Sequence, residues 1–209
     1  MPKTCRCVTL FSALVVACGA EPEPARQEPG CGADAESATV TSGEFSPVTV
    51  TESACGAVTT QESIELGLHV PECSSLTFSS NPPSSGKHYP SWAAFREFTE
   101  PVPRGYWVHS IEHGAVAILY HCSDCASELE AARAMIDALP EEASCAGTGA
   151  ARRVVMTPDP LLDVRWAAAA WGFTLRSDCF EPEVFRDFVL EHIGRGPEDT
   201  CSPGIASWR

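Results

Sequence analysis

Apolar residues in the second half of the chain fall into runs typical of alternating strands and helices. The unbroken apolar run Ala115–Tyr120 predicts a buried strand. A helix is predicted next, with Ser123 as its cap and its end near Leu139, because apolar residues recur on one face and Pro140 follows. The run Arg153–Thr157 predicts a further strand.

The segment Val164–Leu175 is ambiguous between helix and strand. Its four alanines favour a helix, whereas Pro160 and the Trp171-Gly172 pair favour a buried strand, and we predict one strand. A last helix is predicted from Pro182 to just before Gly194. The order strand, helix, strand, strand, helix predicts an α/β fold, with α+β possible: a small mixed sheet with helices on one face.

The first 60 residues are predicted to contribute at most one or two short strands to the globular domain. Residues 18–47 are acidic and rich in proline, which is typical of a flexible linker. β-branched residues alternate over Val48–Thr60 and predict one or two short strands. We therefore expect a single globular domain over residues 48–201 and a C-terminal tail over residues 202–209.

Residues 1–17 have the pattern of a signal peptide. Lys3 and Arg6 precede the apolar stretch Val8–Ala17, which is too short to span a bilayer. The stretch ends at Cys18 in a sequence that resembles a bacterial lipobox, so we predict that Cys18 is lipidated. The protein would then be anchored to the cell envelope, with Gly19 favouring the outer membrane. Cleavage of an ordinary signal peptide, with Cys18 left as a thiol, is the alternative.

Composition narrows the remaining possibilities. The net charge of −14 argues against a nucleic-acid partner. Eight of the eleven cysteines remain once the signal peptide and Cys18 are set aside, which in an exported chain predicts up to four disulfides. A local pair such as Cys55 with Cys73 is one possibility, but the sequence does not select the pairing.

Three of the six histidines lie within the stretch Asn81–Tyr120. The first part of this stretch is dense in Pro, Gly and Ser and predicts an ordered, extended loop. The candidate ligands for zinc or copper are His88, His109 and His113, with Glu112. In a helix His109 and His113 would share a face, but in a straight strand they would lie about 13 Å apart, so a turn at residues 112–114 would be needed.

A second hypothesis is that these histidines are architectural. His109 and His113 would then hydrogen-bond the Pro-rich loop, with ionised Glu112 as a partner. The remaining histidines, His69, His121 and His192, are interpreted as ordinary surface or packing residues.

The same stretch resembles a bacterial family known only as a domain of unknown function. The shared landmarks are the segments NPPSSGKH (81–88) and VHSIEHG (108–114), Trp92 and Tyr120, followed by AWG (170–172) and RGPE (195–198). The resemblance covers about His69 to Glu198. Ser84 stands where the family usually has Thr, and residues 96–98 replace a common Gly-x-Tyr. The family implies export or membrane anchoring but no reaction.

Cys122 and Cys125 offer a different chemistry. They form a Cys-x-x-Cys between a predicted strand and a predicted helix, which is where a thioredoxin-like site is built. A structural disulfide is the other interpretation. A serine hydrolase based on Ser84 and Ser85 is weaker, because the chain has no Gly-x-Ser-x-Gly motif.

Together these patterns predict a lipid-anchored envelope protein with a histidine-rich loop that binds a transition metal. Thiol–disulfide exchange and a non-catalytic structural or interaction role are the alternatives. Four aromatic residues near the loop are interpreted as packing rather than as a ligand cage: Tyr89, Trp92, Tyr106 and Trp107. Nothing in the sequence demonstrates catalysis.

Overall fold

The computed structural model describes residues 36–37, 47–49 and 53–207. Its centre is a six-stranded sheet with the order β2-β3-β8-β7-β5-β6. The strands are β2 (Pro47–Thr49), β3 (Val58–Gln61), β5 (Val116–Tyr120), β6 (Val154–Pro158), β7 (Trp166–Ala170) and β8 (Phe173–Ser177). Strands β5 and β6 run parallel and the other neighbours run antiparallel, so the predicted mixed sheet is confirmed. A separate two-stranded sheet pairs β1 (Glu36–Ser37) with β4 (Leu76–Thr77).

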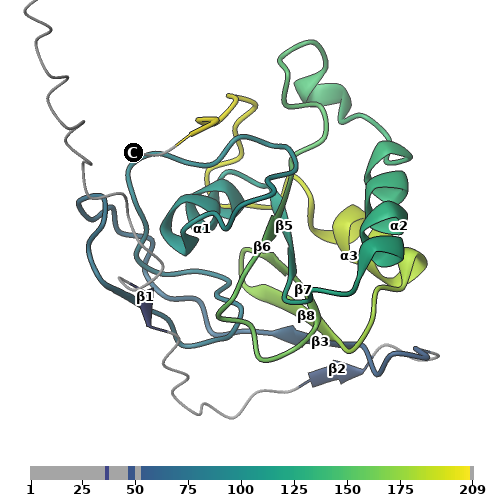
Figure 1. The fold of residues 1–209 in the computed structure, drawn as a ribbon. Helices are drawn as coiled ribbons and strands as arrows, with labels where there is room; N and C mark the ends of the chain where they lie inside the picture. Colours follow the sequence, from purple (N-terminus) through teal and green to yellow (C-terminus); the bar gives the residue numbers. More distant parts are fainter. Residues whose placement is uncertain (1–35, 38–46, 50–52, 208–209) are drawn as a thin grey trace, which may run out of the picture.

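Helices lie on both faces of the six-stranded sheet (Figure 1). Helix α1 (Arg104–Glu112) packs on one face, and α2 (Ala126–Asp137) and α3 (Pro182–His192) pack on the other. Side chains along β5 alternate between the two cores, with Ala117 and Leu119 toward α1 and Val116 and Ile118 toward α2 and α3. The prediction of helices on one face only is therefore wrong, because it overlooked α1.

The elements after β5 follow the predicted order with three changes. Helix α2 begins at Ala126 with Cys125 at its N-cap, so the cap predicted at Ser123 is wrong. The segment predicted as one strand is a hairpin, in which β7 and β8 pair on either side of Gly172. Gly172 has φ +78°, which only glycine adopts without strain, and this lets the chain reverse. A short 3₁₀ helix, Ala143–Cys145, lies between α2 and β6. Helix α3 starts with Pro182 in its first turn, as predicted.

Three disulfides join described residues. They link Cys55 to Cys179, Cys122 to Cys125 and Cys145 to Cys201. Cys73 is also disulfide-bonded. The suggested local pair of Cys55 with Cys73 is wrong, since Cys55 reaches across 124 residues to the strand end before α3. Disulfides of this number indicate an oxidising, exported environment.

The predictions for the N-terminal region fall largely outside the described residues. The signal peptide, Cys18 and most of the linker are among them. Within the described part of the chain, no helix combines the length and apolarity needed to cross a bilayer.

Candidate functional site

Helix α1 places three polar side chains on one face. His109 and Glu112 lie within it, and His113 caps its C-terminal end. Residues three and four apart are neighbours on a helix, so His109, Glu112 and His113 point the same way. The extended loop predicted for the Pro-rich part of the stretch is confirmed over residues 81–103, and the chain turns at residues 113–114. Residues 104–112 between them form a helix, so the separation of 13 Å expected for a strand does not apply. All nine residues of α1 are buried, which leaves no polar face for a periodicity argument to detect.

The Pro-rich loop brings His88 to this face, and a neighbouring segment brings His69. His88 donates its backbone N–H to Leu68 O at 3.1 Å, and its carbonyl accepts from Val70 N at 2.9 Å. This short parallel bridge sets His69 beside His88, with ring centroids 5.0 Å apart. His69 was interpreted from the sequence as an ordinary residue, and its place in the cluster was missed. The one signal was that the family resemblance begins at this position.

Each of three histidines directs its Nδ1 atom at a backbone carbonyl. The distances are 2.9 Å from His88 to Gly86 O, 2.7 Å from His109 to Tyr89 O and 3.0 Å from His113 to Glu198 O. A carbonyl oxygen only accepts, so each Nδ1 carries the hydrogen and donates it. In a neutral imidazole the Nε2 atom then bears a lone pair.

These Nε2 atoms converge beside Glu112. His88 Nε2 lies 3.0 Å from Glu112 Oε2, and His109 Nε2 lies 4.0 Å from it. Among the described residues, buried His88 Nε2 has no well-aligned hydrogen-bond partner besides this short contact with Glu112. His113 Nε2 lies 2.8 Å from His109 Nε2, where two lone pairs would face each other.

The possible ligand atoms form a compact group. One ligand atom from each of His69, His88, His109 and Glu112 lies within 4.8 Å of all the others. Three of the four predicted ligands belong to this group: His88, His109 and Glu112. The fourth, His113, is outside the group and contacts His109 through its Nε2 atom. We call the five residues together the histidine cluster.

Burial sets the charge of the cluster. His88 is fully buried and His109 is 2% exposed, whereas His69 is exposed, so the cluster opens on one side. Burial, followed by the neighbouring charge of His88, lowers the pKa of His109 from 6.5 to about 4. Burial alone would raise the pKa of Glu112, but His88 and the other nearby histidines outweigh it and lower that pKa. At neutral pH His109 is neutral and Glu112 is ionised, as metal ligands require.

Close packing fixes the surroundings of Glu112. A Cβ atom at Gly67 would lie 2.2 Å from Glu112 Oε1, so the chain passes directly over the carboxylate only because residue 67 is glycine. A Cβ at Gly196 would lie 2.1 Å from Glu112 O, which explains glycine there too. The indole of Trp92 lies against His113, with ring centroids 4.5 Å apart.

Two histidines, His121 and His192, lie outside the histidine cluster, and the two candidate nucleophiles, Ser84 and Ser85, are buried. His121 is exposed and contacts Leu162 O through Nδ1 at 2.8 Å. His192 packs between Phe173 and Phe188, as expected for a packing residue. Ser84 and Ser85 are 1% and 3% exposed, which removes them as accessible nucleophiles. Of the four aromatic residues, Tyr89, Tyr106 and Trp107 are fully buried, which confirms their packing role.

The second predicted site is an oxidised pair. Cys125 lies at the start of α2 and is 3% exposed, whereas Cys122 is half-buried. Cys122 lines a hollow of about 330 Å³ together with Pro158 and Pro160. The carboxylate of Glu128 lies within 4.8 Å of both sulfurs.

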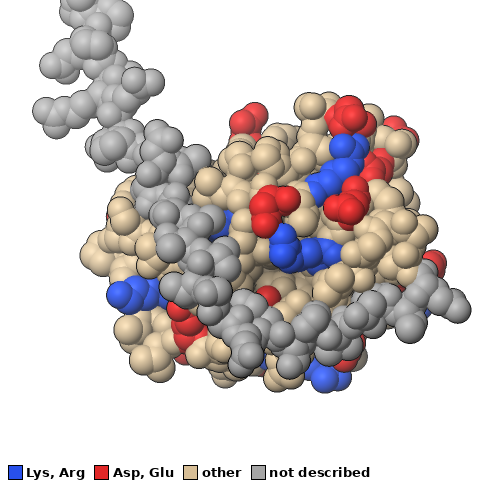
Figure 2. Space-filling view, turned by 90° about the horizontal axis from the view of Figure 1, so that it is seen from below, with Lys and Arg blue, Asp and Glu red and all other residues tan. Residues whose placement is uncertain are grey.

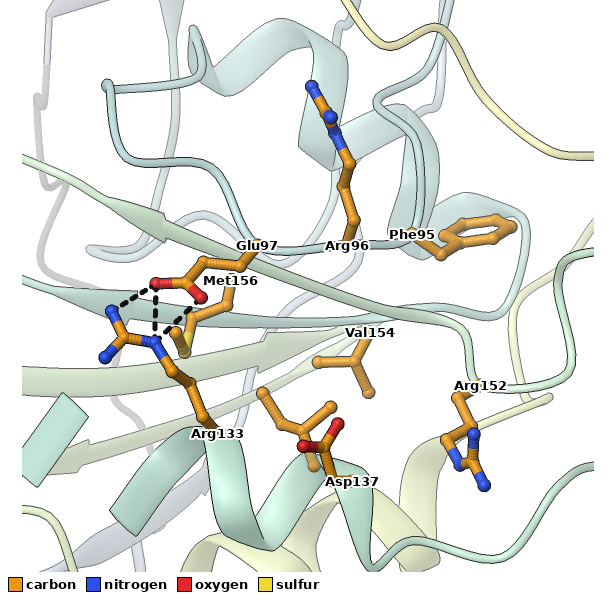
Figure 3. Close-up of a pocket in the computed structure, with 9 residues that line it drawn as sticks. Phe95, Arg96, Glu97, Arg133, Asp137, Arg152, Val154 and Met156 are labelled. Carbon is orange, nitrogen blue, oxygen red and sulfur yellow. Dashed lines mark hydrogen bonds and ion pairs between the residues drawn. The ribbon is translucent and has the colours of Figure 1, made fainter. Parts of the chain in front are cut away.

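A further hollow, of about 330 Å³, lies between α2 and the edge strand β6 (Figure 3). Arg133 on α2 donates to Glu97 across its mouth at 2.7 to 3.1 Å, and Arg96 points away from it. Met156 forms part of its floor. Because Arg133 and Glu97 already neutralise each other, this hollow is a weaker candidate than the histidine cluster.

Basic side chains on the face seen in Figure 2 lie beside acidic ones and form no continuous basic surface. Among the described ion pairs, Arg165 binds Asp124 and Glu128, each at 2.8 Å. This pattern gives no support to phosphate binding, in line with the net charge of −14.

No curated protein and no solved structure matches the chain. The model of the family described as "Protein of unknown function (DUF3105)" matches residues 69–203. The match begins at His69 and spans every residue of the histidine cluster. The chain therefore belongs to the DUF3105 family of proteins of unknown function.

Proposed function

We propose that this protein is an exported envelope lipoprotein whose histidine cluster binds a transition metal ion, zinc or copper. The lipid anchor rests on the lipobox-like sequence before Cys18. The disulfides support export. The metal rests on the geometry of the cluster.

The observation that carries the proposal is the orientation of the imidazoles. His88, His109 and His113 each donate Nδ1–H to a backbone carbonyl, which leaves their Nε2 lone pairs pointing inward. Metal-binding histidines characteristically use their second nitrogen in this way, because it fixes the tautomer and the ring. With the Glu112 carboxylate beside them, these lone pairs lie together in a buried place where a bound cation would make their contacts favourable.

The distances suit a metal centre. Ligand nitrogens about 2.0–2.1 Å from a tetrahedral ion lie about 3.3 Å from one another. The group of His69, His88, His109 and Glu112 lies within 4.8 Å, so small side-chain movements would close it. His69 is exposed and has room to turn toward the ion. Imidazole-rich sites favour zinc and copper among divalent ions.

The architectural hypothesis explains less of this geometry. Hydrogen bonds from Nδ1 would hold the loop whether or not the Nε2 atoms met. The 2.8 Å contact between His109 Nε2 and His113 Nε2 needs a proton or a cation between the two atoms. The lowered pKa of His109 disfavours a proton on the His109 ring at neutral pH.

Elemental analysis of the native, untagged protein tests the proposal. We expect about one zinc or copper per chain, and His88→Ala should lose most of it because it removes a buried ligand. His121→Ala is the matched control, since His121 lies outside the cluster, and it should keep the metal. Native protein without metal that also fails to take up zinc or copper in a titration would refute the proposal.

A second candidate function is thiol–disulfide exchange at Cys122 and Cys125. The observation that favours it is the half-buried Cys122 at the rim of a hollow, with Cys125 buried at the start of α2. A helix N-terminus stabilises a thiolate and therefore supports exchange. Rapid reduction of this disulfide by a stoichiometric protein dithiol would support exchange, and resistance to it would assign the pair to structure.

A further inference from the structure

The sequence His109-Ser110-Ile111-Glu112-His113 has the spacing H-x-x-E-H, with His109 and Glu112 in α1 and His113 at its C-cap. This spacing on a helix presents two imidazoles and a carboxylate together, and it occurs in one class of zinc hydrolases. The spacing alone is a weak signal. Here the structure supplies the helix on which the spacing depends, and it adds His69 and His88 to the same face.

Five groups in one cluster exceed what a four-coordinate ion needs. Catalytic zinc sites use three protein ligands and leave one position for water. His69, His88 and His109 can fill the three ligand positions, which frees Glu112 for another task. Its Oε2 atom is 4.0 Å from His109 Nε2 and would lie next to a water in the fourth position.

We propose that the cluster is the centre of a metal-dependent hydrolase of carboxylic esters or amides, with Glu112 as its general base. This inference rests on the proposed metal site, and it assigns Glu112 to proton transfer rather than to ligation.

The reaction follows from the positions of these groups. A cation held by His69, His88 and His109 would supply Lewis acidity for a water and for the developing oxyanion. Glu112 would take a proton from that water, and the resulting hydroxide would attack the carbonyl carbon of the substrate. When the carbonyl re-forms, the C–O or C–N bond breaks and the proton passes from Glu112 to the departing alcohol or amine. Water is the only co-reactant, and no electron transfer is involved.

The entrance to the cluster indicates what kind of substrate would fit. His69 is its exposed member, and the segment leading to it carries Ile64, Leu66 and Leu68, whose exposed fractions are 66%, 79% and 50%. The same segment passes over Glu112 at Gly67. A hollow of about 330 Å³ adjoins it and is lined by Leu66 and Leu68 together with the charged residues Glu65 and Lys87. A substrate with an apolar group beside its scissile carbonyl would place that group against the two leucines.

The experiment separates the base from a ligand. Full-length protein is stripped with a chelator, reloaded with one equivalent of zinc, and assayed with p-nitrophenyl octanoate and a leucine-containing fluorogenic peptide. Glu112→Gln keeps the size of the side chain but cannot accept the proton. We expect it to retain zinc and to lose turnover by a factor of about 10²–10⁴. Glu130→Gln, an exposed change on α2, should leave both zinc and turnover unchanged.

Three results would overturn the inference, each for a different reason. Loss of zinc in Glu112→Gln would make Glu112 a ligand and overturn the inference. Stoichiometric zinc in the wild type without hydrolysis of either probe would also overturn it, while leaving the metal site in place. Failure of the wild type to hold zinc or copper would remove both proposals together.

Discussion

Acid should destabilise the metal-free protein well above the pH at which most carboxylates titrate. Burial lowers the pKa of His109 from 6.5 in the unfolded chain to about 4 in the folded protein. Below pH 6.5 the imidazole of residue 109 is therefore protonated in the unfolded state, whereas in the folded state it stays neutral until the pH approaches 4. The free energy of unfolding should fall as the pH drops from 6.5 toward 4 and should be fully present above pH 6.5.

The size of the loss follows from the two pKa values. At pH 5 the unfolded histidine is almost fully protonated, whereas His109 in the folded protein is about one tenth protonated, which corresponds to about 2 kcal/mol of lost stability. Complete titration would cost about 3 kcal/mol. His192 adds a loss of the same sign, because burial lowers its pKa as well.

Urea unfolding in the presence of a chelator, at half-unit steps from pH 7.5 to 5, measures this loss. His109→Asn serves as the comparison, because its amide can still donate to Tyr89 O but does not titrate. We expect the wild type to lose about 2 kcal/mol more than His109→Asn over this range. The contribution of His192 cancels, since both proteins contain it. Equal slopes in the two proteins, or wild-type stability that rises toward pH 5, would refute the reasoning.

Three other changes test separate features. Cys18→Ser should abolish lipid labelling and move the protein from the membrane to the soluble fraction, and equal membrane retention would contradict the lipid anchor. Replacing Cys122 and Cys125 with serine should lower the free energy of unfolding by about 2 kcal/mol, the modest value expected for a short loop, and no measurable loss would count against a structural role. Gly67→Ala should displace Glu112, because the new Cβ would lie 2.2 Å from its Oε1, and should lower hydrolysis by the zinc-loaded protein about 10- to 100-fold while zinc content stays unchanged. Unchanged turnover would show that the position of Glu112 does not depend on this contact.

Some elements could be predicted because their cause is local. Strand β5 is an unbroken apolar run buried on both faces, and α3 begins with a proline that suits the first turn. Helix α1 could not be predicted in this way. It is buried on every side and follows Pro101 and Pro103, so it lacks the apolar stripe of a surface helix. The alanines of the β7 segment were correctly assigned to a strand, but the reversal at Gly172 was missed.

The candidate site also contains residues that the sequence could predict and residues that it could not. The residue types in the two histidine motifs were sufficient to nominate His88, His109 and Glu112, because imidazole and carboxylate groups carry the same chemistry in any fold. His69 was missed because its neighbours in sequence are ordinary, and only its bridge to His88 brings it to the cluster. The same is true of the partner of Cys55, which lies 124 residues away.

By itself, the sequence determined the oxidising, exported environment that the cysteines indicate, the family, the main strand and last helix, and most residues of the histidine cluster. These properties depend on composition and on contacts between near neighbours. Only the tertiary structure decided that α1 is a helix, that helices cover both faces of the sheet, and that His69 joins His88, His109 and Glu112. Those outcomes depend on contacts between distant segments, whose free energy is gained only when the chain packs and which leave no periodic trace along it.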